Sequence, residues 1–428
     1  MGRSPVADGV WLSRSAPVFG IAVLLLIVVL WALVARRLET MSVTMAIALV
    51  IVGVVLTRGA HPAISISLDT RVVERGVELV LAILLFVDAN EVPGAAFSRE
   101  RRVLSRLLII ALPLSLLIAW GAGFLLFSGR DGWLLAVLAV IVVPVDLAPA
   151  VAIVRDRHVP ARLRDILNVE SGLNDGLVAP VFLLALAGAS AKHSPGIEAL
   201  ENALPAILIA VGVGAAVGLA GASSLSWSWR RKWTEPSALR LGVLALPVMT
   251  YVLALALGGN GFVAAFVAGV VFAVRARGLP DECLQLTEDT GTLLSLCVWF
   301  IFGEAVNDVL DTGVSLDAIL YALVALTVVR IVPVMLALRG TDISRRDALF
   351  LGWMGPRGLA SLVFGLLAVI GLDGSASGLA GEVMVTTVLL SVVLHGASAR
   401  PIAAAFARVD RRAAAAEEAA PLTPSQPS

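Results

Sequence analysis

The sequence predicts an all-α integral membrane protein with about thirteen transmembrane helices. Three observations support this fold class. Hydrophobic residues make up 59% of the 428 residues and charged residues only 15%, whereas soluble domains carry roughly 25% charged residues. Long apolar segments alternate with short polar connections along almost the whole chain. The basic residues gather in every second connection, as they do in proteins that cross a membrane repeatedly.

Each predicted helix is a mostly apolar stretch close to the length of about 20 residues that crosses a bilayer. The stretches are 17–35, 41–57, 76–91, 103–127, 131–153, 163–187, 201–221, 238–257, 259–274, 289–307, 315–337, 347–370 and 382–406. The eighth and ninth are separated only by the sequence Gly258-Gly259-Asn260-Gly261, in which glycine and asparagine favour a tight turn.

The connections carry a charge asymmetry that orients the chain. Most of the 32 Lys and Arg residues lie in one set of alternate connections. The positive-inside rule places that side in the cytoplasm. We therefore expect a multi-pass protein of the cell inner (plasma) membrane with its N-terminus outside the cell and its C-terminus in the cytoplasm. We expect a short polar N-terminus at 1–16 that is not cleaved, a transmembrane domain at 17–406, and a short disordered cytoplasmic tail at 407–428.

The composition disfavours several other classes of protein. A formal net charge of zero gives no sign of a nucleic-acid partner. Cys283 and Cys297 do not have the spacing of a disulfide framework or a zinc site. The sequence contains no His-Glu-x-x-His and no Gly-x-Ser-x-Gly motif, which argues against an intramembrane enzyme. We therefore expect no enzymatic activity and no cofactor.

Ionisable side chains inside apolar spans are costly, and for that reason they mark candidate functional sites. The candidates are Asp88, Asp146, Glu170, Asp175, Glu304, Arg330 and Arg357. The densest group is the run Glu170-Ser171-Gly172-Leu173-Asn174-Asp175 near the centre of the sixth span. Ser171 and Asp175 share one helix face, and Glu170 and Asn174 share the adjacent one. Their oxygen atoms suit a hard cation, and the alternative is a polar network that only ties helices together.

Two spans are interrupted near their centres. The fifth contains Val143-Pro144-Val145-Asp146-Leu147-Ala148-Pro149, where prolines flank a buried acid and leave backbone carbonyls free. The twelfth contains glycines, a proline and an arginine between 352 and 361. These spans lie seven apart and so run in opposite directions, as an inverted repeat of spans 1–6 and 8–13 would require. Broken helices in such repeats form ion sites, and the alternative is a kinked helix with a structural partner for its acid.

Four stretches together resemble the sodium/proton exchanger family, and specifically its bacterial NhaP-type members. Pro144-Val145-Asp146 resembles the Thr-Asp break of the fifth helix, and the run 170–175 resembles the Glu-Ser-x-x-Asn-Asp motif. Residues 259–269 resemble the Gly-x-Gly-Phe-x-Ala-x-Phe-x-Ala-Gly run, and 352–361 the Gly-x-Arg-Gly-x-x-Ser motif. The resemblance extends from about 17 to 406 and implies an inverted-repeat antiporter fold with broken, crossing helices. It also implies a homodimer in the lipid bilayer that exchanges a monovalent cation, Na⁺ in the first place, for H⁺ in pH homeostasis.

The resemblance further implies roles for individual residues. Asp175 would alternately hold a proton or the cation, and Na⁺ would lie at Asp146, Ser171 and Asp175. The carbonyl of Val145 would lie beside them. Asn174 would mark the branch of the family that exchanges one proton for one cation without net charge movement.

Other residues would act at a distance from the ion. Asp88 would contact the ion through water, although an ordinary interfacial acid is an equal alternative. Glu170 and Arg357 would form a structural ion pair that holds the crossing helices together. Arg330 is expected to be a helix-packing arginine, and Glu304 an acid that lines a cavity.

One departure from the family pattern concerns the choice of ion. Where the family commonly has Thr before the acid of the fifth helix, this chain has Val145, so a hydroxyl is lost and the backbone carbonyl stays. The alternatives are exchange of K⁺ or Li⁺, transport of another solute, a cation channel, and a non-transporting sensor or scaffold.

Overall fold

The protein is described by a computed structural model that covers residues 45–58, 71–91, 99–147, 156–190, 197–276 and 278–418, with residues 22–23, 25–34, 37, 150 and 153. Within these residues the chain is helical, with connecting turns and no strand. The predicted N-terminus at 1–16 and residues 148–149 of the fifth predicted span lie outside them.

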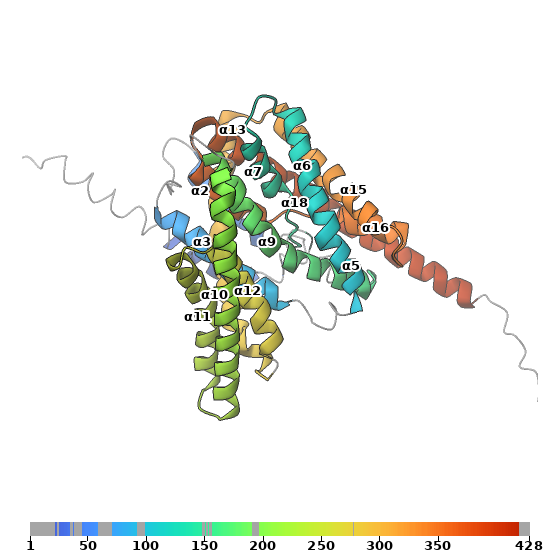
Figure 1. Ribbon diagram of the computed structural model, residues 1–428. Helices are drawn as coiled ribbons and strands as arrows, with labels where there is room; N and C mark the ends of the chain where they lie inside the picture. Colours follow the sequence, from blue (N-terminus) through green and yellow to red (C-terminus); the bar gives the residue numbers. More distant parts are fainter. Residues whose placement is uncertain are drawn as a thin grey trace, which may run out of the picture.

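The helices follow one another in the order that the apolar segments predict (Figure 1). They are α2 (Met45–Thr57), α3 (Arg71–Glu91), α5 (Arg101–Arg106), η1 (Leu107–Ala111), α6 (Leu112–Leu126), α7 (Gly132–Val142), α9 (Ala161–Ser190), α10 (Ile197–Arg230), α11 (Pro236–Ala256), α12 (Gly261–Arg275), η3 (Asp281–Cys283), α13 (Gln285–Thr312), α14 (Leu316–Leu326), α15 (Val328–Ala337), α16 (Arg345–Trp353), α17 (Leu359–Gly371) and α18 (Gly374–Glu418). Each predicted span from 41–57 onward coincides with one helix or with consecutive helical pieces, so the all-α membrane fold is confirmed.

The lengths of the helices separate two kinds of span. In the described part of the chain, seven helices are long and apolar enough by themselves to cross a membrane. Other spans consist of short or interrupted helices, such as α7, α12 and the pair α16 and α17. The interruptions coincide with the two segments in which proline and glycine predict a broken helix.

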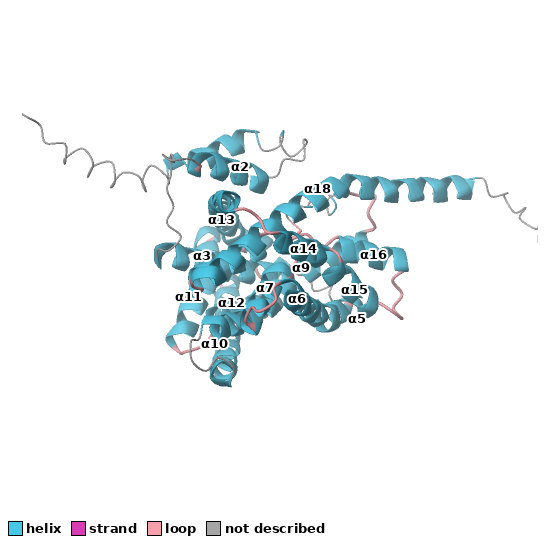
Figure 2. Cartoon of the chain, turned by 90° about the horizontal axis from the view of Figure 1, so that it is seen from above, coloured by secondary structure: helices cyan, strands magenta, loops and turns pink. Residues whose placement is uncertain are grey.

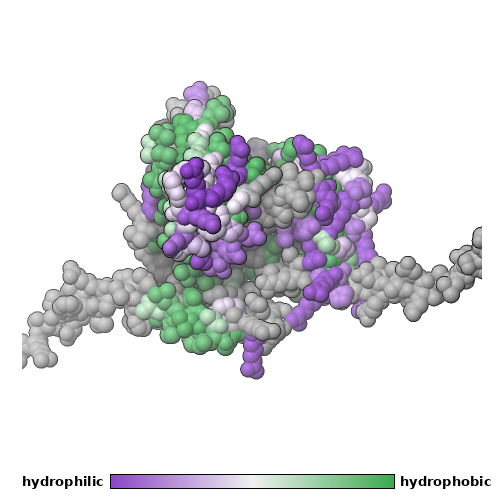
Figure 3. All heavy atoms as spheres, turned by 90° about the horizontal axis from the view of Figure 1, so that it is seen from below, coloured by the Kyte–Doolittle hydropathy of each residue, from purple (hydrophilic) through white to green (hydrophobic). Residues whose placement is uncertain are grey.

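The surface is apolar over large areas, as a lipid-facing protein requires. Leu125 is 85% exposed and Ile109 is 71% exposed. Seen from below, hydrophilic side chains gather on the end of the molecule and hydrophobic side chains cover its flank (Figure 3). Because hydrocarbon tails solvate such side chains as well as a protein core does, their exposure costs little inside a bilayer.

The helices form two lateral groups with α7 and α9 between them (Figures 1 and 2). α10, α11 and α12 lie at one end of the molecule, and α5, α15 and α16 lie at the other (Figures 1 and 2). α12 begins at Asn260, whose Oδ1 accepts hydrogen bonds from the backbone N–H groups of Phe262 and Val263. Gly258 has a φ of +76° in the turn before it, which confirms the predicted tight turn between the eighth and ninth spans.

One prediction about the C-terminus is wrong. α18 reaches Glu418, so the first part of the tail predicted as disordered is helical. Alanine, arginine and glutamate dominate residues 407–418, and these residues are among the strongest helix formers. The sequence beyond Glu418 lies outside the described residues.

Candidate functional site

The two interrupted spans cross at their breaks and are joined there by a backbone hydrogen bond and by a bond from an arginine side chain. The first break follows α7 at residues 143–147, and the second lies between α16 and α17 at residues 354–358. The N–H of Asp146 donates to the carbonyl oxygen of Pro356 at 2.9 Å. A guanidinium nitrogen of Arg357 donates to the carbonyl oxygen of Pro144 at 3.3 Å. Each break therefore satisfies polar backbone groups that the other break frees from its helix.

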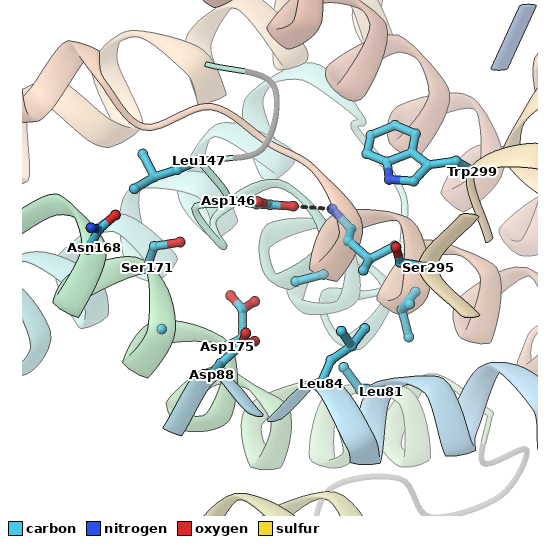
Figure 4. Close-up of a pocket in the computed structure, with 14 residues that line it drawn as sticks. Leu81, Leu84, Asp88, Asp146, Leu147, Asn168, Ser171, Asp175, Ser295 and Trp299 are labelled. Carbon is cyan, nitrogen blue, oxygen red and sulfur yellow. Dashed lines mark hydrogen bonds between the residues drawn. The ribbon is translucent and has the colours of Figure 1, made fainter. Parts of the chain in front are cut away.

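The carboxylate of Asp146 lies at the N-terminus of α17. Its Oδ2 accepts a hydrogen bond from the N–H of Leu359 at 2.7 Å (Figure 4). The first turn of a helix offers free N–H groups and a partial positive charge, so this position stabilises the ionised carboxylate. A Cβ atom added to Gly358 would lie only 2.2 Å from Oδ2, and the close approach therefore depends on glycine at that position.

Asn174 and Ser171, on consecutive turns of α9, hold the backbone of Val145. The side-chain N–H of Asn174 and the hydroxyl of Ser171 both donate to the Val145 carbonyl oxygen, at 3.1 Å and 3.0 Å. The N–H of Val145 in turn donates to Oδ1 of Asn174 at 3.3 Å. An amide side chain can make both of these bonds, whereas a carboxylate accepts only. Asn174 thus clamps the break beside Asp146.

Three carboxylates line one cavity of about 310 Å³ between α3, α9, α13, α17 and the first break. Asp88, Asp146 and Asp175 lie on its wall together with Ser171 (Figure 4). Asp175 is only 8% exposed, and its Oδ1 has no hydrogen-bond partner within the described residues. Negative groups around so small a space repel one another, so the cavity favours a bound cation or a proton.

The buried arginines and Glu170 are paired differently from the prediction. Glu170 forms a two-pronged ion pair with Arg330, with nitrogen–oxygen distances of 2.5 Å and 2.7 Å. The predicted pair of Glu170 with Arg357 is therefore wrong. Arg357, which is fully buried, donates instead to the backbone carbonyls of Pro144, Gly355 and Ala325. Because Arg357 is needed at the carbonyls of the crossing, Arg330 of α15 is the cation that neutralises Glu170.

Comparison with known proteins identifies the family of this chain. The model of the transmembrane sodium/hydrogen exchanger family matches residues 21–405. This chain belongs to the sodium/hydrogen exchanger family.

Individual exchangers are similar over much of the chain. The Na⁺/H⁺ antiporter ApNhaP of Aphanothece halophytica is 24% identical over 349 residues, which are 77% of this chain and 64% of that protein. The K⁺/H⁺ antiporter NhaP of Alkalimonas amylolytica is 26% identical over 274 residues, 62% of this chain and 46% of that protein. The chain thus spans less than two thirds of the length of these two relatives.

The solved structure of the sodium proton antiporter MjNhaP1 of Methanocaldococcus jannaschii has the same fold. It superposes with a TM-score of 0.73 at 19% identity and covers 91% of this chain and 98% of that one. The predicted inverted-repeat antiporter fold with broken, crossing helices is confirmed by this match.

The structure brings only some of the predicted site residues to the cavity. Asp88, Asp146, Ser171 and Asp175 line it. Val145 and Asn174 do not line it, and they contact each other behind its wall. Glu304, expected to line a cavity, is likewise not among the lining residues.

Sequence reasoning missed three polar or aromatic residues of the cavity wall. Asn168, Ser295 and Trp299 line it. Asn168 precedes Ser171 by three positions and Asp175 by seven, so helical periodicity along α9 could have identified it. Ser295 and Trp299 lie on α13, which carries no motif at that point.

Proposed function

We propose that this chain is a secondary active antiporter that exchanges a monovalent cation, Na⁺ in the first place, for H⁺ by alternating access. The observation that carries the proposal is the cavity lined by Asp88, Asp146 and Asp175, in which Asp175 has an oxygen without a hydrogen-bond partner among the described residues. Membership of the sodium/hydrogen exchanger family supports the same function. The activity therefore needs a carboxylate whose occupant changes during the cycle.

Competition for Asp175 would couple the two fluxes. A carboxylate in a site of low dielectric constant is costly when it is ionised and bare, so it binds either a proton or a cation. If only the occupied forms cross between the two sides, each ion moves in exchange for the other. We assign Asp175 this alternating role.

The remaining ligands would come from both sides of the cavity. Asp146 would stay ionised, because the N–H of Leu359 donates to it at the start of α17. Ser171 has lone pairs available for Na⁺ while its proton is donated to the Val145 carbonyl. Asp88 would contact the ion through a water molecule. Asn174 would position the break and supply no charge.

The moving part would be the bundle of α7, α9, α16, α17 and α18, which correspond to the fifth, sixth, twelfth and thirteenth spans. Hydrogen bonds between the two breaks support their motion as a unit. The pair of Glu170 and Arg330 links α15 to the same unit, so we include the eleventh span in it. The other helices would form the stationary part, and we propose that they mediate a homodimer.

A charge-neutral variant tests the function. Asp175→Asn in proteoliposomes should abolish proton movement driven by a Na⁺ gradient. The amide of Asn neither takes up a proton nor neutralises the charge of a bound cation. Asp165→Asn is the matched control, since Asp165 lies on the same helix outside the cavity. Sodium-driven proton flux that survives in Asp175→Asn would refute the proposal.

Potassium is the second candidate for the cation. Val145 stands where the family commonly has threonine, and one relative is a K⁺/H⁺ antiporter. Flux driven in turn by Na⁺, K⁺ and Li⁺ gradients of equal size distinguishes the candidates. If K⁺ alone drives proton movement, the site is a potassium site and the assignment of Na⁺ is wrong.

The orientation of the chain is also a proposal. The basic connections support a cytoplasmic C-terminus and an external N-terminus in the cell inner membrane. A reporter that is active only in the cytoplasm should give a signal when it is fused to the C-terminus. If only a reporter that is active outside the cell gives a signal there, the proposed orientation is wrong.

A further inference from the structure

His395 of α18 is completely buried, and its two ring nitrogens contact the end of α16 on one side and Ser391 of α18 on the other. Its Nε2 lies 3.0 Å from the carbonyl oxygen of Trp353, the last residue of α16. Its Nδ1 lies 3.0 Å from the backbone carbonyl oxygen of Ser391 and 3.1 Å from the hydroxyl oxygen of the same residue. In the tautomer that carries the proton on Nε2, the ring donates to the Trp353 carbonyl and accepts the Ser391 hydroxyl on Nδ1.

Ser391 extends this contact to the other end of the break. Its hydroxyl oxygen accepts the backbone N–H of Arg357 at 2.7 Å. A continuous chain of hydrogen bonds therefore runs from the N–H of Arg357 through Ser391 and His395 to the carbonyl of Trp353. The carbonyl of Trp353 also accepts the N–H of Gly355 at 2.8 Å inside the break, so the ring of His395 is its second partner.

Trp353 makes a second contact with the same face of α18. Its ring lies 5.3 Å from the ring of His395, and its Nε1–H donates to the hydroxyl of Ser398 at 3.0 Å. Ser391, His395 and Ser398 are spaced four and three residues apart and so share one face of the helix. This face of α18 therefore contacts the end of α16 at both the backbone and the side chain of Trp353.

The bridged segment is the one that holds Asp146. Pro356 accepts the N–H of Asp146, and Leu359 donates to its carboxylate. Pro356 lies between Trp353 and Arg357 in the sequence, and Leu359 follows Arg357 by two residues. A shift of this segment would move both partners of Asp146 together.

We propose that His395 is a positioning residue for the cation site, which acts by spanning the break of the twelfth transmembrane segment and so fixing the backbone that holds Asp146. The inference rests on the proposed cation/proton exchange for its transport readouts. Nothing in this role requires His395 to change its protonation state during the cycle.

Variants of His395 separate its hydrogen bonds from its volume. His395→Phe fills a similar space and removes both bonds. His395→Gln keeps a side-chain N–H that can donate to Trp353. Ser391→Ala removes only the link to Arg357. Thr387→Val is the matched control, because Thr387 lies on the same helix, is also fully buried, and has a hydroxyl without a partner within the described residues.

Transport kinetics and amide exchange are then measured on all variants. His395→Phe should raise the apparent KM for Na⁺ about tenfold, the effect of one lost buried hydrogen bond. Ser391→Ala should act in the same direction, and Thr387→Val should match the wild type. Hydrogen–deuterium exchange of residues 353–359 should accelerate in His395→Phe and not in Thr387→Val. His395→Gln should lie nearer to the wild type, with an unchanged pH profile of exchange.

Two results would overturn the inference. One is a wild-type KM together with wild-type amide exchange in His395→Phe. The other is a shifted pH profile in His395→Gln, which would show that the histidine acts by titrating. If the wild type itself shows no cation-driven proton flux, the proposed function fails, while amide exchange at 353–359 still decides whether His395 holds the break.

Discussion

The ion pair of Glu170 and Arg330 gives the sharpest test of how the site is held together. The perturbation is a double-mutant cycle with Glu170→Gln, Arg330→Gln and the two combined. Glutamine keeps much of each side chain's volume and removes its charge. The cycle therefore measures the coupling between the two charges rather than the packing of either side chain.

The structure sets the size of the expected effect. Both nitrogen–oxygen contacts are short, and the side chains of Arg330 and Glu170 are 5% and 3% exposed. Removal of one partner leaves an uncompensated buried charge, which costs about 3–5 kcal/mol of unfolding free energy. Removal of both partners should cost much less than the sum of the single changes, because no bare charge remains.

The assay is unfolding of the purified protein in mixed micelles of increasing SDS content, followed by tryptophan fluorescence. Glu100→Gln is the control. Glu100 also binds an arginine through two contacts, but Arg162 is 39% exposed and has a second partner in Asp342. Glu100 itself is buried, but the charge that its removal leaves, on Arg162, is exposed to solvent and stays paired with Asp342. Such a pair contributes about 1 kcal/mol or less, so the control should unfold close to the wild type.

Simple additivity of the two single changes would refute the pairing. A parallel cycle with Glu170→Gln and Arg357→Gln should show the smaller coupling, since the hydrogen bonds of Arg357 go to backbone carbonyls and those of Glu170 to Arg330. If that second cycle has the larger coupling, Arg357 is the partner of Glu170 after all.

Three further predictions concern the cavity and its ion. Gly358→Ala should reduce exchange at least tenfold while leaving the protein folded. The added Cβ would lie 2.2 Å from Asp146 Oδ2, whereas the ordinary contact limit is about 3.5 Å. Wild-type exchange in this variant would show that the break can shift without loss of transport. Asn168→Ala should raise the apparent KM for Na⁺ a fewfold without changing unfolding, since Asn168 lines the cavity, and an unchanged KM would exclude it from the ion's surroundings. Exchange should be electroneutral, because Asn174 is engaged with the backbone of Val145 and carries no charge; an equilibrium pH gradient that shifts when the membrane potential is clamped at different values would disprove one-for-one stoichiometry.

The fold class and the positions of the breaks could be predicted from the sequence because both depend on local physics. An apolar run of about 20 residues must form a helix in a bilayer, where every backbone group needs a partner within the segment. Proline and glycine near the centre of the fifth and twelfth spans interrupt that helix wherever it is placed. The motif residues Asp146, Ser171 and Asp175 line one cavity, and their role as ligands of the cation stays a prediction.

The charge pairing could not be predicted from local physics. Arg330 and Arg357 are both single arginines inside apolar spans, and helical periodicity gives only the face of a side chain on its own helix. Which cation Glu170 meets depends on how α9 and α15 are rotated and how deep each lies, across a sequence separation of 160 residues. The same reason explains why Ser295 and Trp299 were missed, since α13 joins the cavity wall only through packing.

The sequence by itself therefore determined that this chain is a many-spanning membrane protein with two broken helices and a carboxylate-rich centre. Only the tertiary structure decided which backbone groups the breaks share, which arginine neutralises Glu170, and that His395 reaches both ends of the second break. The physical reason is that helix formation and its interruption are set within about one turn of the chain. A buried hydrogen bond or ion pair is instead set by the relative placement of two helices, which the packing of the whole bundle determines.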